Sequence, residues 1–124
     1  GVFSWTGEDD QSCMLGVTFE ESDVDGTDEA KVRAAVELAR AWVDSFDLDS
    51  VDRSRAVDRW LDHMTRISAN RTPRDEIERI FREDGSLEAY ALSYEVSRQL
   101  DDYLREQGIE PSLVNPAISM GCEQ

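Results

Sequence analysis

The sequence predicts a mainly α protein: an antiparallel, bundle-like domain of four helices, with a short strand or hairpin before it and an extended C-terminal tail after it. Four segments carry apolar residues at the three- and four-residue spacing of an amphipathic helix. A residue suited to cap a helix precedes each segment, and only short stretches separate them. These patterns divide the 124-residue chain into an acidic extended segment at 1–26, a helical domain at 27–108 and a tail at 109–124.

The first segment has no helical period and carries two short apolar stretches. One runs from Val2 to Trp5. In the other, every second residue is apolar: Cys13, Leu15, Val17 and Phe19. Alternation with a period of two is typical of a strand with one buried face. Because an isolated hairpin is only marginally stable in water, we expect either a hairpin that packs on the helices or an arm that becomes ordered on a partner.

The first helix is expected at about 28–46, capped by Thr27 or Asp28, and the second at about 51–69, capped by Ser50. The apolar stripe of the first consists of Val32, Val36, Ala39, Trp42, Val43 and Phe46. The stripe of the second consists of Val57, Trp60, Leu61, Met64 and Ile67. Each stripe must pack against another element, so both tryptophans should be substantially buried.

The third helix should begin at Thr72, where a capping residue, a first-turn proline and an early aspartate follow one another, and should end at Gly85. Its buried face would be Ile77, Ile80 and Phe81. The fourth is expected at about 87–107, capped by Ser86 and ended by Gly108. Its lining residues are Leu87, Tyr90, Ala91, Tyr94, Leu100, Tyr103 and Leu104. The tail that follows has two prolines and no period, so we expect it to be extended and frayed.

Charge is distributed unevenly along this chain, whose net charge is −15. Residues 1–30 hold nine acids and no base, residues 31–83 hold eleven of each sign, and residues 84–124 hold eight acids against two arginines. Such a field repels nucleic acid and anionic membranes and favours a protein partner. Lys31 is the only lysine beside twelve arginines, a bias that fits either a GC-rich genome or a halophilic organism.

The two cysteines, Cys13 and Cys122, lie at opposite ends of the chain. We expect two free thiols in a cytoplasmic protein, since a disulfide would require the two ends to meet. No apolar run approaches the roughly 18 residues of a membrane span, and no secretory signal is visible. The composition therefore predicts a soluble protein with no membrane contact, and it leaves the oligomeric state open.

Residues suited to catalysis or metal binding are sparse. His63 is the only histidine, which with two distant cysteines does not make a zinc site. The acids of 21–26 resemble half of a calcium loop, but Val32 stands where the closing glutamate belongs. The pair Asp101–Asp102 has no second acidic motif to face it. We therefore predict a protein that is not an enzyme and that binds no metal and no cofactor.

The leading functional prediction is a small acidic interaction module: an adaptor, an accessory subunit or an inhibitor of a larger partner. The acidic, irregular ends can become ordered on a partner without reducing the stability of the helical domain. Arginines share one face of the second predicted helix, opposite the Trp60 stripe; we expect them either to pair with aspartates at three- and four-residue spacing or to form a local anion-binding surface. The candidate partner-binding residues are Phe3, Trp5, Glu8, Asp9, Asp10, Arg55, Arg59 and Arg66.

Two alternatives remain open at this stage. The arginine-rich region at 53–74 could belong to a DNA-binding regulator, with the second and third helices as a helix-turn-helix, although the third helix is net negative and would meet phosphate repulsion. Alternatively, the acidic surface could imitate nucleic-acid phosphate and inhibit a protein that handles DNA or RNA.

Overall fold

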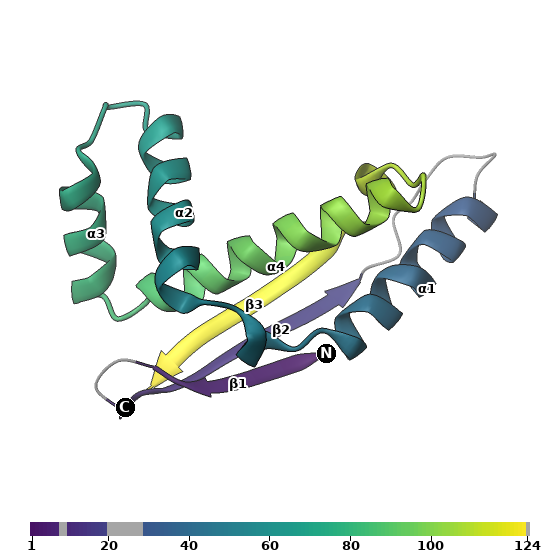
Figure 1. Ribbon diagram of the computed structural model, residues 1–124, viewed down its shortest axis with the longest axis horizontal. Coiled ribbons are helices and arrows are strands. Elements are labelled where there is room, and N and C mark those ends of the chain that lie inside the picture. The colour runs from purple at the N-terminus through teal and green to yellow at the C-terminus, as the bar shows by residue number, and fades with distance from the viewer. Residues whose placement is uncertain (8–9, 20–28, 124) are drawn as a thin grey trace.

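The computed structural model describes residues 1–7, 10–19 and 29–123, which form a mixed α/β fold (Figure 1). Four α-helices are combined with a three-stranded antiparallel sheet in this part of the chain. The prediction of a mainly α bundle is therefore wrong. Apolar stripes show which face of a helix is buried, but they do not show whether a helix or a sheet covers that face.

The sheet joins the two ends of the chain. Strand β1 spans Val2–Thr6, β2 spans Ser12–Phe19 and β3 spans Pro116–Glu123, in the order β1-β2-β3. The hairpin that we expected near the N-terminus is β1-β2, in which Trp5 pairs with Cys13. The predicted extended tail is wrong, because its last residues form β3 along the other edge of β2.

The helices begin and end close to their predicted positions. Helix α1 spans Glu29–Ser45, α2 Arg53–Ile67, α3 Arg74–Glu83 and α4 Leu87–Glu106, with short 3₁₀ turns at Leu48–Ser50 (η2) and Pro111–Leu113 (η3). Asp52, rather than the expected Ser50, caps α2, because its carboxylate accepts a hydrogen bond from the backbone N–H of Arg55. The predicted cap of α1 lies outside the described residues.

The elements form a sheet layer, a helix layer and a projecting helical hairpin (Figure 1). Helices α1 and α4 pack on one face of the sheet, where Leu15 and Val17 are buried with Ala39, Leu92 and Val96. The hairpin of α2 and α3 packs on the N-terminal half of α4, where Trp60 stacks against Tyr90. Trp60 is buried as expected, whereas Trp42 is half-buried and lies against the core.

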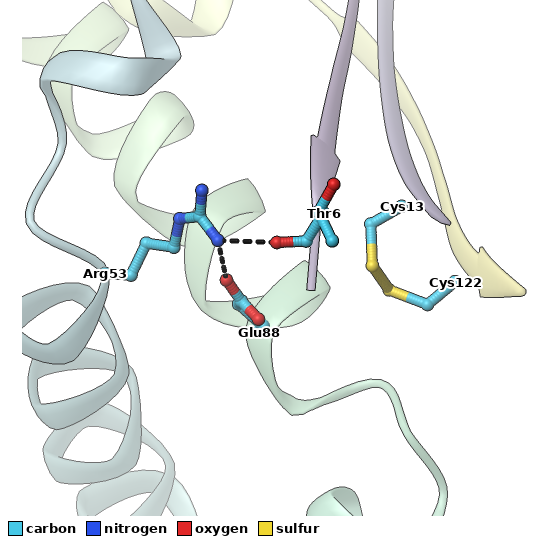
Figure 2. Close-up of a disulfide and its surroundings, with 5 residues drawn as sticks. All are labelled: Thr6, Cys13, Arg53, Glu88 and Cys122. Carbon is cyan, nitrogen blue, oxygen red and sulfur yellow. Dashed lines mark hydrogen bonds and ion pairs between the residues drawn. A yellow bond between two sulfur atoms is a disulfide. The ribbon is translucent and has the colours of Figure 1, made fainter. Parts of the chain in front are cut away.

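A disulfide joins Cys13 of β2 to Cys122 of β3 (Figure 2). The register places the two residues directly opposite each other, with their Cα atoms 4.1 Å apart. The prediction of two free thiols is therefore wrong, because the pairing of the first and last thirds of the chain brings its two cysteines together. Among the described residues, no helix is both long enough and apolar enough to cross a membrane.

Candidate interaction surfaces

Two residues that we expected to bind a partner lie on the inner face of the sheet, which packs against the helices. Trp5 is only 8% exposed, and Phe3 is half-buried with its ring edge-on to Phe46 at 5.9 Å between centroids. Both pair with inward-facing residues of β2, Leu15 and Cys13, and therefore point toward the helices. Trp5 belongs to the core and Phe3 packs against it, so the fold accounts for both aromatic residues, and a partner-binding role for them stays a prediction.

The outer face of the sheet carries almost no charge. Its side chains come from alternate positions of the three paired strands: Val2, Ser4, Thr6, Ser12, Met14, Gly16, Thr18, Ala117, Ser119, Gly121 and Glu123. Glu123 is the only ionisable side chain among them, in a chain of which 33% of the residues are charged. Val2 and Met14 are 67% and 55% exposed, so this face presents apolar side chains to solvent.

Small residues keep the outer face flat. A Cβ atom at Gly16 would lie 2.8 Å from the Ser119 hydroxyl oxygen, whereas a Cβ atom at Gly121 would meet no atom within 4 Å. The β3 side of the face is therefore open enough to accept either a closely approaching partner or an added side chain.

The acidic residues of the β1–β2 connection are placed only in part. Asp10 is exposed and has a φ of 59°, a left-handed conformation that an aspartate tolerates in a turn. Glu8 and Asp9 lie outside the described residues. The structure therefore puts one of the three predicted acidic partner residues at the surface, at the end of the sheet where β1 meets β2.

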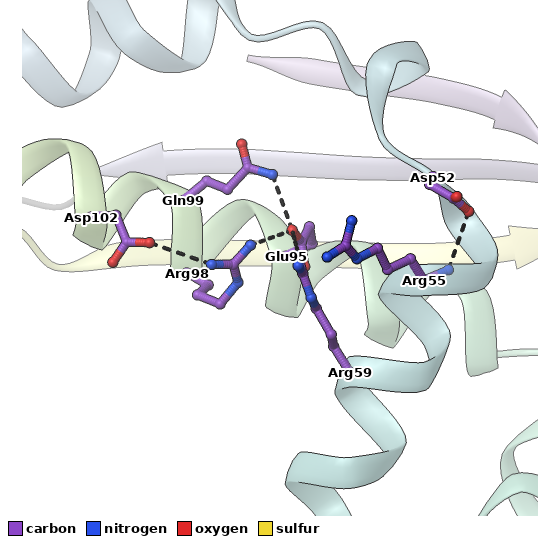
Figure 3. Close-up of polar contacts among 7 residues, drawn as sticks. All are labelled: Asp52, Arg55, Arg59, Glu95, Arg98, Gln99 and Asp102. Atoms are coloured by element: carbon purple, nitrogen blue, oxygen red, sulfur yellow. Dashed lines mark hydrogen bonds and ion pairs between the residues drawn. The ribbon is translucent and has the colours of Figure 1, made fainter.

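The predicted arginines of α2 have different surroundings. Arg59 donates to the carboxylate of Glu95 on α4 at 3.0 Å. Arg55 is exposed, and Figure 3 shows its guanidinium extended toward Glu95. Arg66 is exposed and has no ion pair or hydrogen bond within the part of the chain that the structure describes.

Other arginines of this region are neutralised by carboxylates. Arg53 donates to Glu88 at 2.9 Å and to the backbone carbonyl of Thr6 at 2.8 Å, which ties the end of β1 to α2 and α4 (Figure 2). Arg74 is paired with both Asp58 and Asp62. These ion pairs reduce the positive charge that a DNA backbone would require from this region.

Glu95 is the centre of a network that sequence reasoning missed (Figure 3). Its side chain is buried, and its Oε1 atom accepts from Arg59, from Arg98 at 2.5 Å and from Gln99 at 3.1 Å. Burial alone raises the pKa of Glu95, but the hydrogen bonds from Arg98 and Gln99 and the charges of both arginines outweigh burial and hold the pKa below its ordinary value. This carboxylate therefore stays ionised and fixes two guanidinium groups beside α2.

Two cavities adjoin α2. A cavity of about 240 Å³ between α2 and α4 is lined by Arg59, Asp62, Arg66, Tyr94 and Arg98. A larger one, of about 410 Å³, has a mixed lining of both charges: Gly7, Arg53, Ser54, Val57, Asp58, Glu78, Arg82, Leu87 and Glu88. The smaller cavity concentrates positive charge, whereas the carboxylates of the larger one balance its arginines.

The residues considered for catalysis or metal binding lie on two helices where they are described: His63 on α2, and Asp101 and Asp102 on α4, where burial raises the pKa of Asp101. The ring of His63 stacks on Tyr94 at 4.7 Å between centroids. The acidic motif at 21–26 lies outside the described residues. Within the described ranges, no group of three or more His, Cys, Asp or Glu residues is arranged to hold a metal ion. Comparison of the chain with protein-family models, with curated proteins and with solved structures found no match.

Proposed function

We propose that this protein is a non-enzymatic interaction module that binds a basic protein partner through the outer face of its sheet. The observation that carries the proposal is the near absence of charge on that face, given the high charge of the whole chain. The central part of a protein interface is depleted of charged residues, whereas an ordinary solvated face is not.

The energetics of burial favour this face as the contact surface. Removing a charged side chain from water costs free energy unless a partner compensates the charge. On the outer face, Glu123 is the one charged side chain that a partner would have to remove from water. The exposed apolar side chains Val2 and Met14 would contribute about 25 cal/mol for each Å² of apolar area that the partner covers. The flat surface around Gly121 allows the partner to approach the backbone closely.

The net charge favours a basic partner. A charge of −15 attracts a positively charged protein over several ångströms and accelerates its association at low ionic strength. The partner that fits has an uncharged, partly apolar centre to cover the sheet and basic residues at its margin.

The disulfide supports an oxidising compartment as the place of action. Disulfides persist in such compartments and are rare in the cytoplasm, where thiols are kept reduced. A disulfide between Cys13 and Cys122 does not fit the cytoplasmic location, with two free thiols, that we expected from the sequence. We therefore propose that the interaction takes place outside the reducing cytoplasm.

Binding can be tested by placing a charge on the outer face. Gly121→Glu adds a carboxylate at a position where a Cβ atom meets no other atom within 4 Å, and Ala34→Glu adds the same charge to an exposed position of α1. Both variants and the wild type are immobilised, and proteins captured from extracytoplasmic extracts of the host are quantified at low and high salt.

A basic protein that the wild type and Ala34→Glu retain at low salt, and that Gly121→Glu loses, supports the proposal. Equal retention by all three proteins excludes the outer face as the contact surface. Failure of the wild type to retain any protein above the level of a blank matrix contradicts the interaction function itself. Thermal unfolding followed by circular dichroism checks that both variants remain folded.

A further inference from the structure

The cavity between α2 and α4 gathers positive charge on an otherwise acidic protein. It is lined by Arg59 and Arg66 of α2 and by Arg98 and Tyr94 of α4. Asp62 also lines it, but the carboxylate of Asp62 is bonded to Arg74. Three guanidinium groups therefore border a space of about 240 Å³, which is large enough for a small anion and a group attached to it.

Two of these guanidinium groups are held in place before any ligand arrives. Arg59 and Arg98 both bond to the single Oε1 atom of Glu95, and Arg98 also reaches Asp102 at 3.4 Å. Glu95 and Asp102 offset the charges of Arg59 and Arg98, so the positive charge that no described carboxylate pairs at the cavity is that of Arg66. Arginines whose positions are already fixed lose little conformational entropy when they bind a ligand.

The third guanidinium group, that of Arg66, keeps its donors available. Within the described residues it has no hydrogen bond and no ion pair. An arginine has five N–H donors in a planar fork that matches the oxygens of phosphate or carboxylate. The side chain of Tyr94 adds a hydroxyl at the cavity wall and is itself positioned by its stacking on His63.

From this arrangement we infer that the cavity binds a small, doubly charged oxyanion of the phosphate-monoester class. The ligand oxygens would accept hydrogen bonds from Arg66, from the remaining donors of Arg59 and from Arg98. A phosphate monoester is favoured over a single carboxylate because its three terminal oxygens can accept hydrogen bonds from several guanidinium groups at once. This site lies on the helices and is independent of the proposed role of the sheet face.

The test measures anion binding with inorganic phosphate and phenyl phosphate as probes, and with succinate and acetate for comparison. Titrations are followed by amide chemical shifts and by calorimetry at constant ionic strength in chloride. The variants are Arg66→Gln, which changes an exposed side chain that has no partner among the described residues, and Arg33→Gln, which removes the same charge from an exposed position of α1.

We expect saturable phosphate binding that shifts the amides around Tyr94. Arg66→Gln should weaken this binding by about tenfold, the effect of losing one charge-assisted hydrogen bond. Arg33→Gln should leave it unchanged. The inference is overturned by non-saturable shifts, by equal weakening in both variants, or by succinate or acetate binding more tightly than phosphate.

Discussion

Cys13 and Cys122 lie directly opposite each other on β2 and β3, so one disulfide closes a loop in which they are separated by 109 positions. The same two strands contribute Leu15, Val17 and Ile118 to the packing beneath α1 and α4. The bond therefore connects the two ends of the chain through the centre of the fold, and it restricts the unfolded chain more than a short-range disulfide would.

Reduction of this disulfide should lower the free energy of unfolding by about 2–5 kcal/mol, because the chain regains the entropy of an open loop of this length. The comparison is between urea unfolding of the oxidised protein and unfolding in the presence of a reductant. A Cys13→Ala/Cys122→Ala double variant provides the control, since a reductant should not change its midpoint. A midpoint for the wild type that is unchanged on reduction would show that the bond adds no stability.

Glu95→Gln should destabilise the protein by about 2 kcal/mol at neutral pH. The substitution removes the charge that holds Arg59 and Arg98, but both arginines are partly exposed and can turn to water, which limits the loss. Glu37→Gln, at an exposed position of α1, is the matched control and should cost almost nothing. Urea unfolding of the three proteins measures the difference.

The effect of Glu95→Gln should depend on pH in a defined direction. Because the pKa of Glu95 in the folded protein lies below its ordinary value of 4.5, its ionised form stabilises the fold above that pH. The contribution is lost as pH falls through the folded pKa. The stability difference between wild type and Glu95→Gln should therefore shrink as the pH is lowered below 4.5, and a difference that stays constant would contradict the assignment.

The sequence allowed the local elements to be predicted well and their partners poorly. Helices α1 to α4 lie within about two residues of their expected bounds, because apolar spacing is a local signal, although Ser50 and Thr72 are not the N-caps and Ser86 makes no side-chain capping bond. The alternation that runs from Cys13 to Phe19 likewise predicted β2. Strand β3 was missed although a short alternation was present: Ile118, Met120 and Cys122 are on the inward register and alternate with Ser119 and Gly121, but the run is short and prolines precede it. Its pairing with β2 is a long-range contact that no local pattern encodes.

The interaction surfaces could be predicted only where one element supplies the residues. Arg55, Arg59 and Arg66 were found because they share a face of α2. Arg98, which lines the cavity, and Glu95, which holds Arg59 and Arg98, lie on α4 and were missed. One signal was present: Glu95 falls among Ala91, Leu92 and Val96 on the buried side of α4, where an acid needs a partner. The part of the outer face on β1 and β2 follows from the predicted hairpin, whereas the part on β3 could not be predicted, because it exists only when β3 pairs with β2.

Substitutions at two glycines should have opposite effects on stability. A Cβ atom at Gly7 would lie 2.8 Å from the Cys13 sulfur, which the disulfide prevents from moving aside. Gly7→Ala should therefore cost about 1–3 kcal/mol. At Gly121 an added Cβ atom has no other atom within 4 Å, and Gly121→Ala removes a glycine from a strand. This substitution should therefore raise the free energy of unfolding by about 0.5 kcal/mol. Thermal or urea unfolding of both variants tests the pair, and a Gly7→Ala variant as stable as the wild type would contradict the close contact.

Removal of residues 115–124 distinguishes a structural third strand from a frayed tail. Loss of β3 exposes the edge of β2 and uncovers the core on which Ile118 and Cys122 pack, so the truncated protein should be unfolded or at least about 3 kcal/mol less stable. Because truncation also removes the disulfide, the comparison is made with the Cys13→Ala/Cys122→Ala variant, and the truncated chain carries Cys13→Ala as well. Circular dichroism and urea unfolding of the two proteins measure the contribution of the strand alone. Equal stability would mean that these residues do not form the edge of the sheet.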